Sequence, residues 1–127
     1  MEKYEVPKTP KMPAVLLDPD QGIFELEGNS IPEDAGIFYK PIVEAIENYF
    51  KSPQLKTTIN IKLVYFNSAS SKWLMNILKL FKFLPKEGQE IDINWYYDEN
   101  DEDMADMIDD IQSLLGLPIK IHPLEST

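Results

Sequence analysis

The chain has 127 residues, of which 43% are hydrophobic, and its 22 acidic against 12 basic residues give a formal net charge of −10. This length and composition predict one globular domain over residues 1–127, and the acidic balance argues against bare nucleic acid and anionic membranes as partners. The chain has no cysteine and a single histidine, His122, which excludes disulfides, thiolate chemistry and metal sites rich in cysteine or histidine.

The amino-terminal part of the chain is expected to form a hairpin. Residues 1–13 contain three prolines and are interpreted as an extended lead-in. A short apolar run over residues 14–17 is followed by the turn sequence DPDQG over residues 18–22 and by a second strand pattern over residues 23–27. Two strands joined by such a turn are typical of a β-hairpin.

One helix and two longer strands are predicted next. The helix is expected from Pro32 to Phe50, with a kink or a break at Pro41, because proline cannot donate the helical hydrogen bond. In the strands, at residues 57–66 and 90–97, apolar and polar residues alternate, which indicates a sheet covered on one face only. The expected inward residues are Ile59, Ile61, Leu63, Tyr65, Ile91, Ile93, Trp95 and Tyr97, and the outward ones are Thr58, Asn60, Lys62, Asp92, Asn94 and Tyr96.

The remaining elements are two amphipathic helices and a last strand. Helices are predicted at residues 70–84 and 101–115, a strand at residues 119–121, and a frayed tail at residues 123–127, with Gly116 ending the last helix. Their apolar stripes are expected to consist of Leu74, Ile77, Leu78 and Phe81 in the first helix and of Met104, Ile108, Ile111 and Leu115 in the second.

The element order is therefore β-β-α-β-α-β-α-β, which predicts the α/β class. Strands that alternate with helices are expected to be parallel and to be joined by right-handed crossovers, while the opening hairpin makes the sheet mixed. The helices are expected mainly on one face. No apolar run reaches the roughly 20 residues of a membrane span, and the first residues lack the apolar core of a signal peptide, so a cytoplasmic protein is expected.

The segment NSASSK over residues 67–72 is the most informative place for function. A strand ends and a helix begins there, so Ser68, Ser70 or Ser71 is expected to cap the helix. One hydroxyl is enough for a cap, yet three are present, and a helix N-terminus also favours a phosphate. A phosphate on Ser68 would add about −1.5 to −2 charges, and Lys72, one turn further on, could pair with it. Capping alone and phosphorylation both remain open from the pattern.

Acidic residues cluster between Asp98 and Asp110, where eight acids occur without a base. A calcium loop that starts at Asp98 would need glycine sixth and glutamate twelfth, but Asp103 and Asp109 occupy those places, so no metal site is predicted. The run is more typical of a solvated helix face or a partner surface. His122 shares no motif with a nucleophile, and the glycine motifs that cradle phosphates are absent.

Several stretches in order along nearly the whole chain resemble the SiaC family of bacterial regulatory phosphoproteins. The matching stretches are TP over residues 9–10, LDP over residues 17–19, Gly22, GNSIPEDA over residues 28–35, FYKP over residues 38–41, YFNSASSK over residues 65–72 and NWYYDENDEDM over residues 94–104. Each stretch alone is weak, and together they are specific.

This resemblance implies a STAS-like fold, similar to that of the anti-sigma-factor antagonists, in a switch protein without catalysis, metal or cofactor. It implies that a dedicated kinase phosphorylates a hydroxyl residue after the strand-ending Asn67. The matching position is Ser68, where threonine is usual in the family, with Ser70 and Ser71 as alternatives. It also implies that a PP2C-type phosphatase removes the phosphate, and that the unphosphorylated form activates a diguanylate cyclase, which raises cyclic-di-GMP and promotes biofilm formation.

The partner is expected to contact Asn67 and one face of the helix that follows the switch. That face carries Lys72, Met75, Lys79 and Lys82. Two other functions remain open. One is a constitutive scaffold that is never phosphorylated. The other is a small enzyme that uses paired carboxylates such as Asp98 and Asp101, which would need a pocket that shifts their pKa values.

Overall fold

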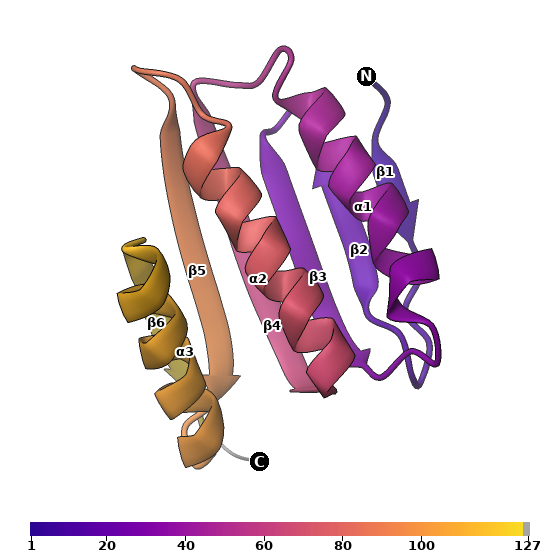
Figure 1. Cartoon of the computed structure of the whole chain (residues 1–127), viewed down its shortest axis with the longest axis vertical. Coiled ribbons are helices and arrows are strands. Elements are labelled where there is room, and N and C mark those ends of the chain that lie inside the picture. Colours follow the sequence, from indigo (N-terminus) through magenta and orange to yellow (C-terminus); the bar gives the residue numbers. More distant parts are fainter. Residues whose placement is uncertain (126–127) are drawn as a thin grey trace.

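The computed structural model describes residues 1–125 and consists of one six-stranded mixed sheet with three helices on one of its faces (Figure 1). We call that side the covered face and the opposite side the open face. The elements are β1 Tyr4–Val6, β2 Ala14–Asp18, β3 Ile23–Ser30, α1 Ala35–Tyr49, β4 Lys56–Phe66, α2 Ser68–Phe83, β5 Glu90–Asp98, α3 Glu102–Leu115 and β6 Ile119–Leu124.

The strands lie side by side in chain order. β1, β2 and β3 are antiparallel, and β3, β4, β5 and β6 are parallel, with one helix in each parallel connection. This arrangement confirms the predicted mixed α/β fold. The elements at the two chain termini differ from the expectation. β1 lies within the expected lead-in, where Tyr4 pairs opposite Leu17. β6 extends to Leu124, which lies within the expected tail. The last two residues of that tail, 126–127, lie outside the described residues.

α1 differs from its prediction at its start and at its proline. The helix begins at Ala35 rather than at Pro32, because Asp34 accepts a hydrogen bond from the amide of Ile37 at 3.3 Å and caps the helix. It continues through Pro41 without a break. Pro41 lies on the exposed side while Ile42 is buried, so packing of the inner side stabilises the helix despite the missing hydrogen bond.

The covered face contains the hydrophobic core, and the predicted alternation accounts for most of it. Ile59, Ile61 and Leu63 of β4 are at most 2% exposed, as expected, and both predicted helix stripes are buried. Tyr65 was predicted to point inward but is 60% exposed. The register of β3 and β4 shifts here, since Gly28 lies opposite Leu63 and Asn29 opposite Tyr65, which leaves Val64 as an extra residue. Such a bulge changes which side chains face the core beyond it.

The fold brings three helix starts to one edge of the sheet. The parallel strands end at this edge, and α1, α2 and α3 each begin there, toward the bottom of Figure 1. Their N-caps are Asp34, Asn67 and Asp101. Sites in parallel sheets usually lie at this carboxyl edge. No helix within residues 1–125 is both long and apolar enough to cross a membrane.

Candidate functional site

Asn67 connects β4 to α2 and is the residue that caps α2. Its Oδ1 accepts a hydrogen bond from the amide of Ser70 at 2.9 Å, and its Nδ2 donates to the carbonyl of Pro32 at 3.3 Å. Its backbone amide donates to the carbonyl of Ser30 at 3.1 Å. The expectation that one of the serines caps the helix is therefore wrong. An asparagine accepts the same bond, and the hydroxyls are left for other roles.

The three serines that follow lie in three different environments. Ser70 is 0% exposed, and its Oγ donates to the carbonyl of Ser30 at 2.9 Å and lies 2.8 Å from the Ser30 Oγ. Ser71 is partly buried and donates from its Oγ to the carbonyl of Ser68 at 2.8 Å. Ser68 is exposed and is the first residue of α2. Only Ser68 combines exposure with a position at the helix N-terminus.

Three buried hydroxyl groups, those of Ser30, Tyr39 and Ser70, form a hydrogen-bonded cluster next to the start of α2. The Ser30 Oγ is hydrogen-bonded both to Ser70 and to the phenol of Tyr39 on α1. Burial raises the pKa of Tyr39, although its hydrogen bonds to the two serines oppose that change. Tyr39 also stacks on Trp73 of α2, with ring centroids 6.1 Å apart. The cluster therefore ties α1 and α2 to the end of β3, and its member Ser70 lies two residues after the exposed Ser68.

The predicted lysine face of α2 is present, but its members are not equivalent. Lys72 and Lys79 are exposed, whereas Met75 is partly buried and packs against the core. The Nζ of Lys82 donates to the carbonyl of Leu115 and lies 5.3 Å from the ring centroid of Phe83. Lys82 therefore caps the carboxyl end of α3, where a cation is favourable. Its role in partner binding, like that of Asn67, Lys72, Met75 and Lys79, stays a prediction.

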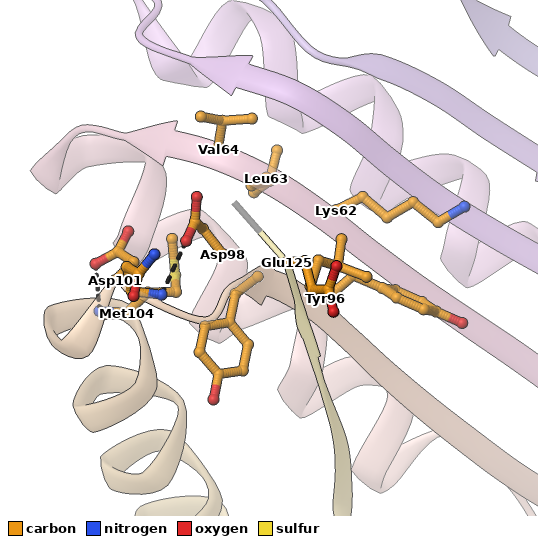
Figure 2. Close-up of a pocket in the computed structure, with 11 residues that line it drawn as sticks. Lys62, Leu63, Val64, Tyr96, Asp98, Asp101, Met104 and Glu125 are labelled. Atoms are coloured by element: carbon orange, nitrogen blue, oxygen red, sulfur yellow. Dashed lines mark hydrogen bonds between the residues drawn. The ribbon is translucent and has the colours of Figure 1, made fainter. Parts of the chain in front are cut away.

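A hollow of about 580 Å³ lies at the carboxyl ends of β4 and β5, and we call it the notch (Figure 2). Asp98 and Asp101, weighed above as a catalytic pair, are two of its lining residues. The Oδ1 of Asp98 accepts from the amide of Asn100 at 2.8 Å, and that of Asp101 accepts from the amide of Met104 at 3.0 Å. The lining residues are Lys62, Leu63, Val64, Tyr96, Tyr97, Asp98, Asn100, Asp101, Met104, Leu124 and Glu125.

Both aspartates of the notch make hydrogen bonds to backbone amides. The two aspartates hold the loop before α3 and its first turn, which is a structural task. Across the described residues, no three acidic or histidine side chains are grouped in a way that could hold a metal ion. The notch was not predicted from the sequence. The one sequence feature that indicates it is the pair Val64 and Tyr65, two large residues in a row where the alternation of the strand was expected to continue.

On the open face, a row of hydrogen bonds crosses four strands. The Nε2 of His122 on β6 lies 2.8 Å from Oδ1 of Asn94 on β5. Asn94 donates to Asn60 of β4 at 3.3 Å, and Asn60 donates to Glu25 of β3 at 2.8 Å. We call this row the amide ladder. Tyr96 stacks on His122 with centroids 4.5 Å apart, which confirms that Tyr96 faces the uncovered side and that His122 is a partly buried edge residue.

Comparison with sequences of known proteins places nearly the whole chain in one group. The sequence model for "SiaC family regulatory phosphoprotein" matches residues 6–124. A curated protein of Pseudomonas aeruginosa strain UCBPP-PA14, which is described as uncharacterized, is 25% identical over 122 residues. That match covers 96% of this chain and 97% of the relative.

Comparison with solved structures shows the same fold. The crystal structure of apo-SiaC from Pseudomonas aeruginosa matches with a TM-score of 0.86 and 24% identity, covering 96% of this chain and 99% of that one. A chain in the crystal structure of the diguanylate cyclase SiaD in complex with its activator SiaC, from the same organism, matches with a TM-score of 0.87 and 24% identity. This second match covers 95% of this chain and 99% of that one.

Proposed function

Because this chain belongs to the SiaC family of regulatory phosphoproteins, whose model matches residues 6–124, we propose that it is a binding protein switched by phosphorylation at Ser68. In this proposal the unphosphorylated form binds and activates a diguanylate cyclase, and the chain itself performs no catalysis. The solved complex in which SiaC accompanies the cyclase SiaD supports this choice of partner.

The observation that carries the proposal is the different burial of the three serines. A kinase must bring its own active site to the hydroxyl, which the fully buried Ser70 does not allow without local unfolding. Ser71 uses its hydroxyl in a hydrogen bond to the carbonyl of Ser68. Ser68 is exposed, and its side chain has no hydrogen-bond partner among residues 1–125. These environments favour Ser68 over the two alternatives.

A phosphate at Ser68 would change the surface without unfolding the domain. It would lie at the N-terminus of α2, whose dipole and free amides favour an anion, one turn before Lys72. Asn67 already supplies the cap, so no native hydrogen bond of the helix start needs to break. The phosphorylated and unphosphorylated forms therefore share one fold and differ in the local charge by about −1.5 to −2.

This change of charge is the proposed means of inhibition. A partner that packs closely over Ser68 would have to desolvate the dianion, which costs several kcal/mol when no partner cation compensates it. A cost of about 3 kcal/mol corresponds to a more than hundredfold loss of affinity. Lys72, Met75 and Lys79 continue from Ser68 along the same side of α2, so we propose that this side is the contact surface.

The rest of the cycle follows the family resemblance. We propose that a cognate kinase adds the phosphate and that a PP2C-type phosphatase removes it, so that the ratio of their activities sets the amount of active cyclase. The output would then be the level of cyclic-di-GMP and, through it, biofilm formation. The exposed Ser68 at the start of α2 is accessible to both enzymes without opening of the sheet.

The test compares alanine at two serine positions, Ser68 and Ser71, and adds aspartate at Ser68. Ser68→Ala is expected to abolish phosphorylation by the cognate kinase while the cyclase is still activated, and Ser68→Asp is expected to activate it poorly. Ser71→Ala is the matched control and should remain switchable. Phosphopeptide mapping together with the rate of cyclic-di-GMP synthesis measures both effects. Phosphate found only on Ser70 or Ser71 would contradict the assignment, and a protein from cells with no phosphate under any condition would favour the scaffold.

The contact surface has a separate test. Lys79→Glu is expected to weaken cyclase binding about tenfold or more, since it opposes the electrostatic complementarity of the surface. Lys51→Glu, an exposed lysine after α1, is the matched control. Lys82 is unsuitable, because its loss would also uncap α3. Equal binding by the Lys79 and Lys51 variants in titration calorimetry would show that the cyclase uses another surface.

A further inference from the structure

The notch exists because β4 and β5 separate before either strand ends. Their register stops at Ile61 opposite Trp95, although β4 continues to Phe66 and β5 to Asp98. Beyond that point β5 pairs only with β6, and β4 pairs only with β3. Among the described residues, the last part of β4, residues 62–66, thus has no strand paired on its β5 side. An unpaired strand edge is a template for an added extended segment.

The rim of the notch is apolar and exposed. Val64, the bulge residue of β4, is 71% exposed, and Leu124 at the end of β6 is 50% exposed. Both line the notch, and Tyr65, the residue that follows Val64, is 60% exposed. The volume of about 580 Å³ is large enough for a long side chain together with a piece of backbone. Large exposed apolar residues around a hollow are typical of an interaction site.

The charge inside the notch selects the kind of side chain that fits. Three carboxylates, those of Asp98, Asp101 and Glu125, line it against one cation, Lys62 (Figure 2). Lys62 makes a cation–π contact with Tyr96, with its Nζ 5.2 Å from the centroid of the tyrosine ring. An arginine has an aliphatic stem that suits the apolar rim and a planar head that pairs with carboxylates. Arginine is also enriched among the residues that dominate binding energy at interfaces.

We propose that the notch binds an extended segment of another protein, whose backbone pairs with the free edge of β4 and whose arginine enters the notch. This goes beyond the proposed function, because it is a second surface with the opposite charge preference to the lysine face of α2. Ser68 lies two residues after the end of β4, so its phosphate would attract an arginine-bearing segment. Binding at the notch is therefore retained, or tightened, in the phosphorylated protein.

The experiment titrates the full chain with a ten-residue synthetic peptide of alternating arginine and valine, and follows the backbone amides by NMR. The largest shifts are expected at residues 62–66 and 96–98. Asp101→Asn is the main variant, since asparagine keeps the cap of α3 while one charge is lost, and it should weaken binding roughly three- to tenfold. Val64→Lys should weaken it more than tenfold, because it adds a like charge at the rim. Ser68→Asp should bind at least as tightly as the wild type.

Two controls separate this proposal from general attraction to an acidic protein. Asp109→Asn removes the same charge from the exposed side of α3 and should change the affinity less than twofold. A peptide with glutamate in place of arginine should not bind. Equal effects of Asp101→Asn and Asp109→Asn, equal binding of both peptides, or amide shifts outside the notch would overturn the proposal. Shifts at the notch that depend on protein concentration without peptide would assign it instead to a second copy of this chain.

Discussion

On the covered face, β3, β4 and β5 contribute Phe24, Ile61 and Trp95, and each of these side chains is at most 1% exposed. On the open face, the same strands contribute Glu25, Asn60 and Asn94, which are joined by the amide ladder. The two faces use the same backbone and are stabilised in different ways. Burial of apolar area stabilises the covered face, whereas the open face relies on hydrogen bonds that water can partly replace.

A cavity in the covered face is expected to destabilise the protein more than any change on the open face. Ile61→Ala is expected to lower the free energy of unfolding by about 2–5 kcal/mol, because the site is fully enclosed and cannot collapse. The neighbouring change on the open face, Asn60→Ala, is expected to cost about 1 kcal/mol. Urea denaturation followed by tryptophan fluorescence measures both. Equal costs would mean that the open face contributes to stability as the core does.

Two serines of α2 allow the same comparison at the candidate site. Ser70→Ala removes a buried hydroxyl that donates to Ser30, and it is expected to lower stability by about 1–2 kcal/mol. Ser68→Ala removes an exposed hydroxyl and is expected to change stability by less than about 0.5 kcal/mol. Thermal denaturation of the unphosphorylated proteins measures the difference. Should Ser68→Ala prove the more destabilising change, its effect on the switch could not be read as loss of a phosphate acceptor.

On the open face, the amide ladder fixes the tautomer of His122. Because Asn94 uses its nitrogen to donate to Asn60, its oxygen accepts from Nε2 of His122, which predicts the Nε2–H tautomer for the neutral ring. Asn94→Ala is expected to weaken this tautomer preference and to cost about 1 kcal/mol. Nitrogen chemical shifts of the imidazole report the tautomer. An Nδ1–H ring in the wild-type protein would show that the side-chain amide of Asn94 is oriented the other way, with its nitrogen toward His122.

An ion pair on the open face is expected to contribute little to stability. Lys120 lies 2.9 Å from Asp92, and its hydrogen bond lowers the pKa of Asp92 below the ordinary 3.8. The ion pair therefore contributes its full stability at pH values above the ordinary pKa of 3.8, and this contribution is lost as the pH falls through the lowered pKa of Asp92. Because Lys120 is 67% exposed, the gain is expected to be below about 1 kcal/mol. Asp92→Asn should remove this acid-dependent part in unfolding curves between pH 2 and 7, and 1 M salt should mimic it.

The local elements and the face that each residue occupies were largely predictable from the sequence. Alternation in two strands placed Ile59 and Ile93 in the core and Asn60 and Asn94 opposite, and periodicity placed both helix stripes. These features depend on neighbours within a few residues, so the pattern is sufficient. The prediction of Tyr65 failed because the bulge at Val64 depends on pairing with β3, more than 30 residues earlier in the chain.

At the candidate site, the local pattern of residues was enough to predict that a hydroxyl-rich turn joins a strand to a helix, and it favoured Ser68 as the phosphate acceptor. The fold sets how the three serines differ, because Ser70 is buried by Ser30, 40 residues away, and Asn67 is held by Pro32. It also decided that Lys82 caps α3 and that β4 and β5 diverge to form the notch. Burial and strand pairing are set by contacts between distant parts of the chain, which no local pattern of residues contains.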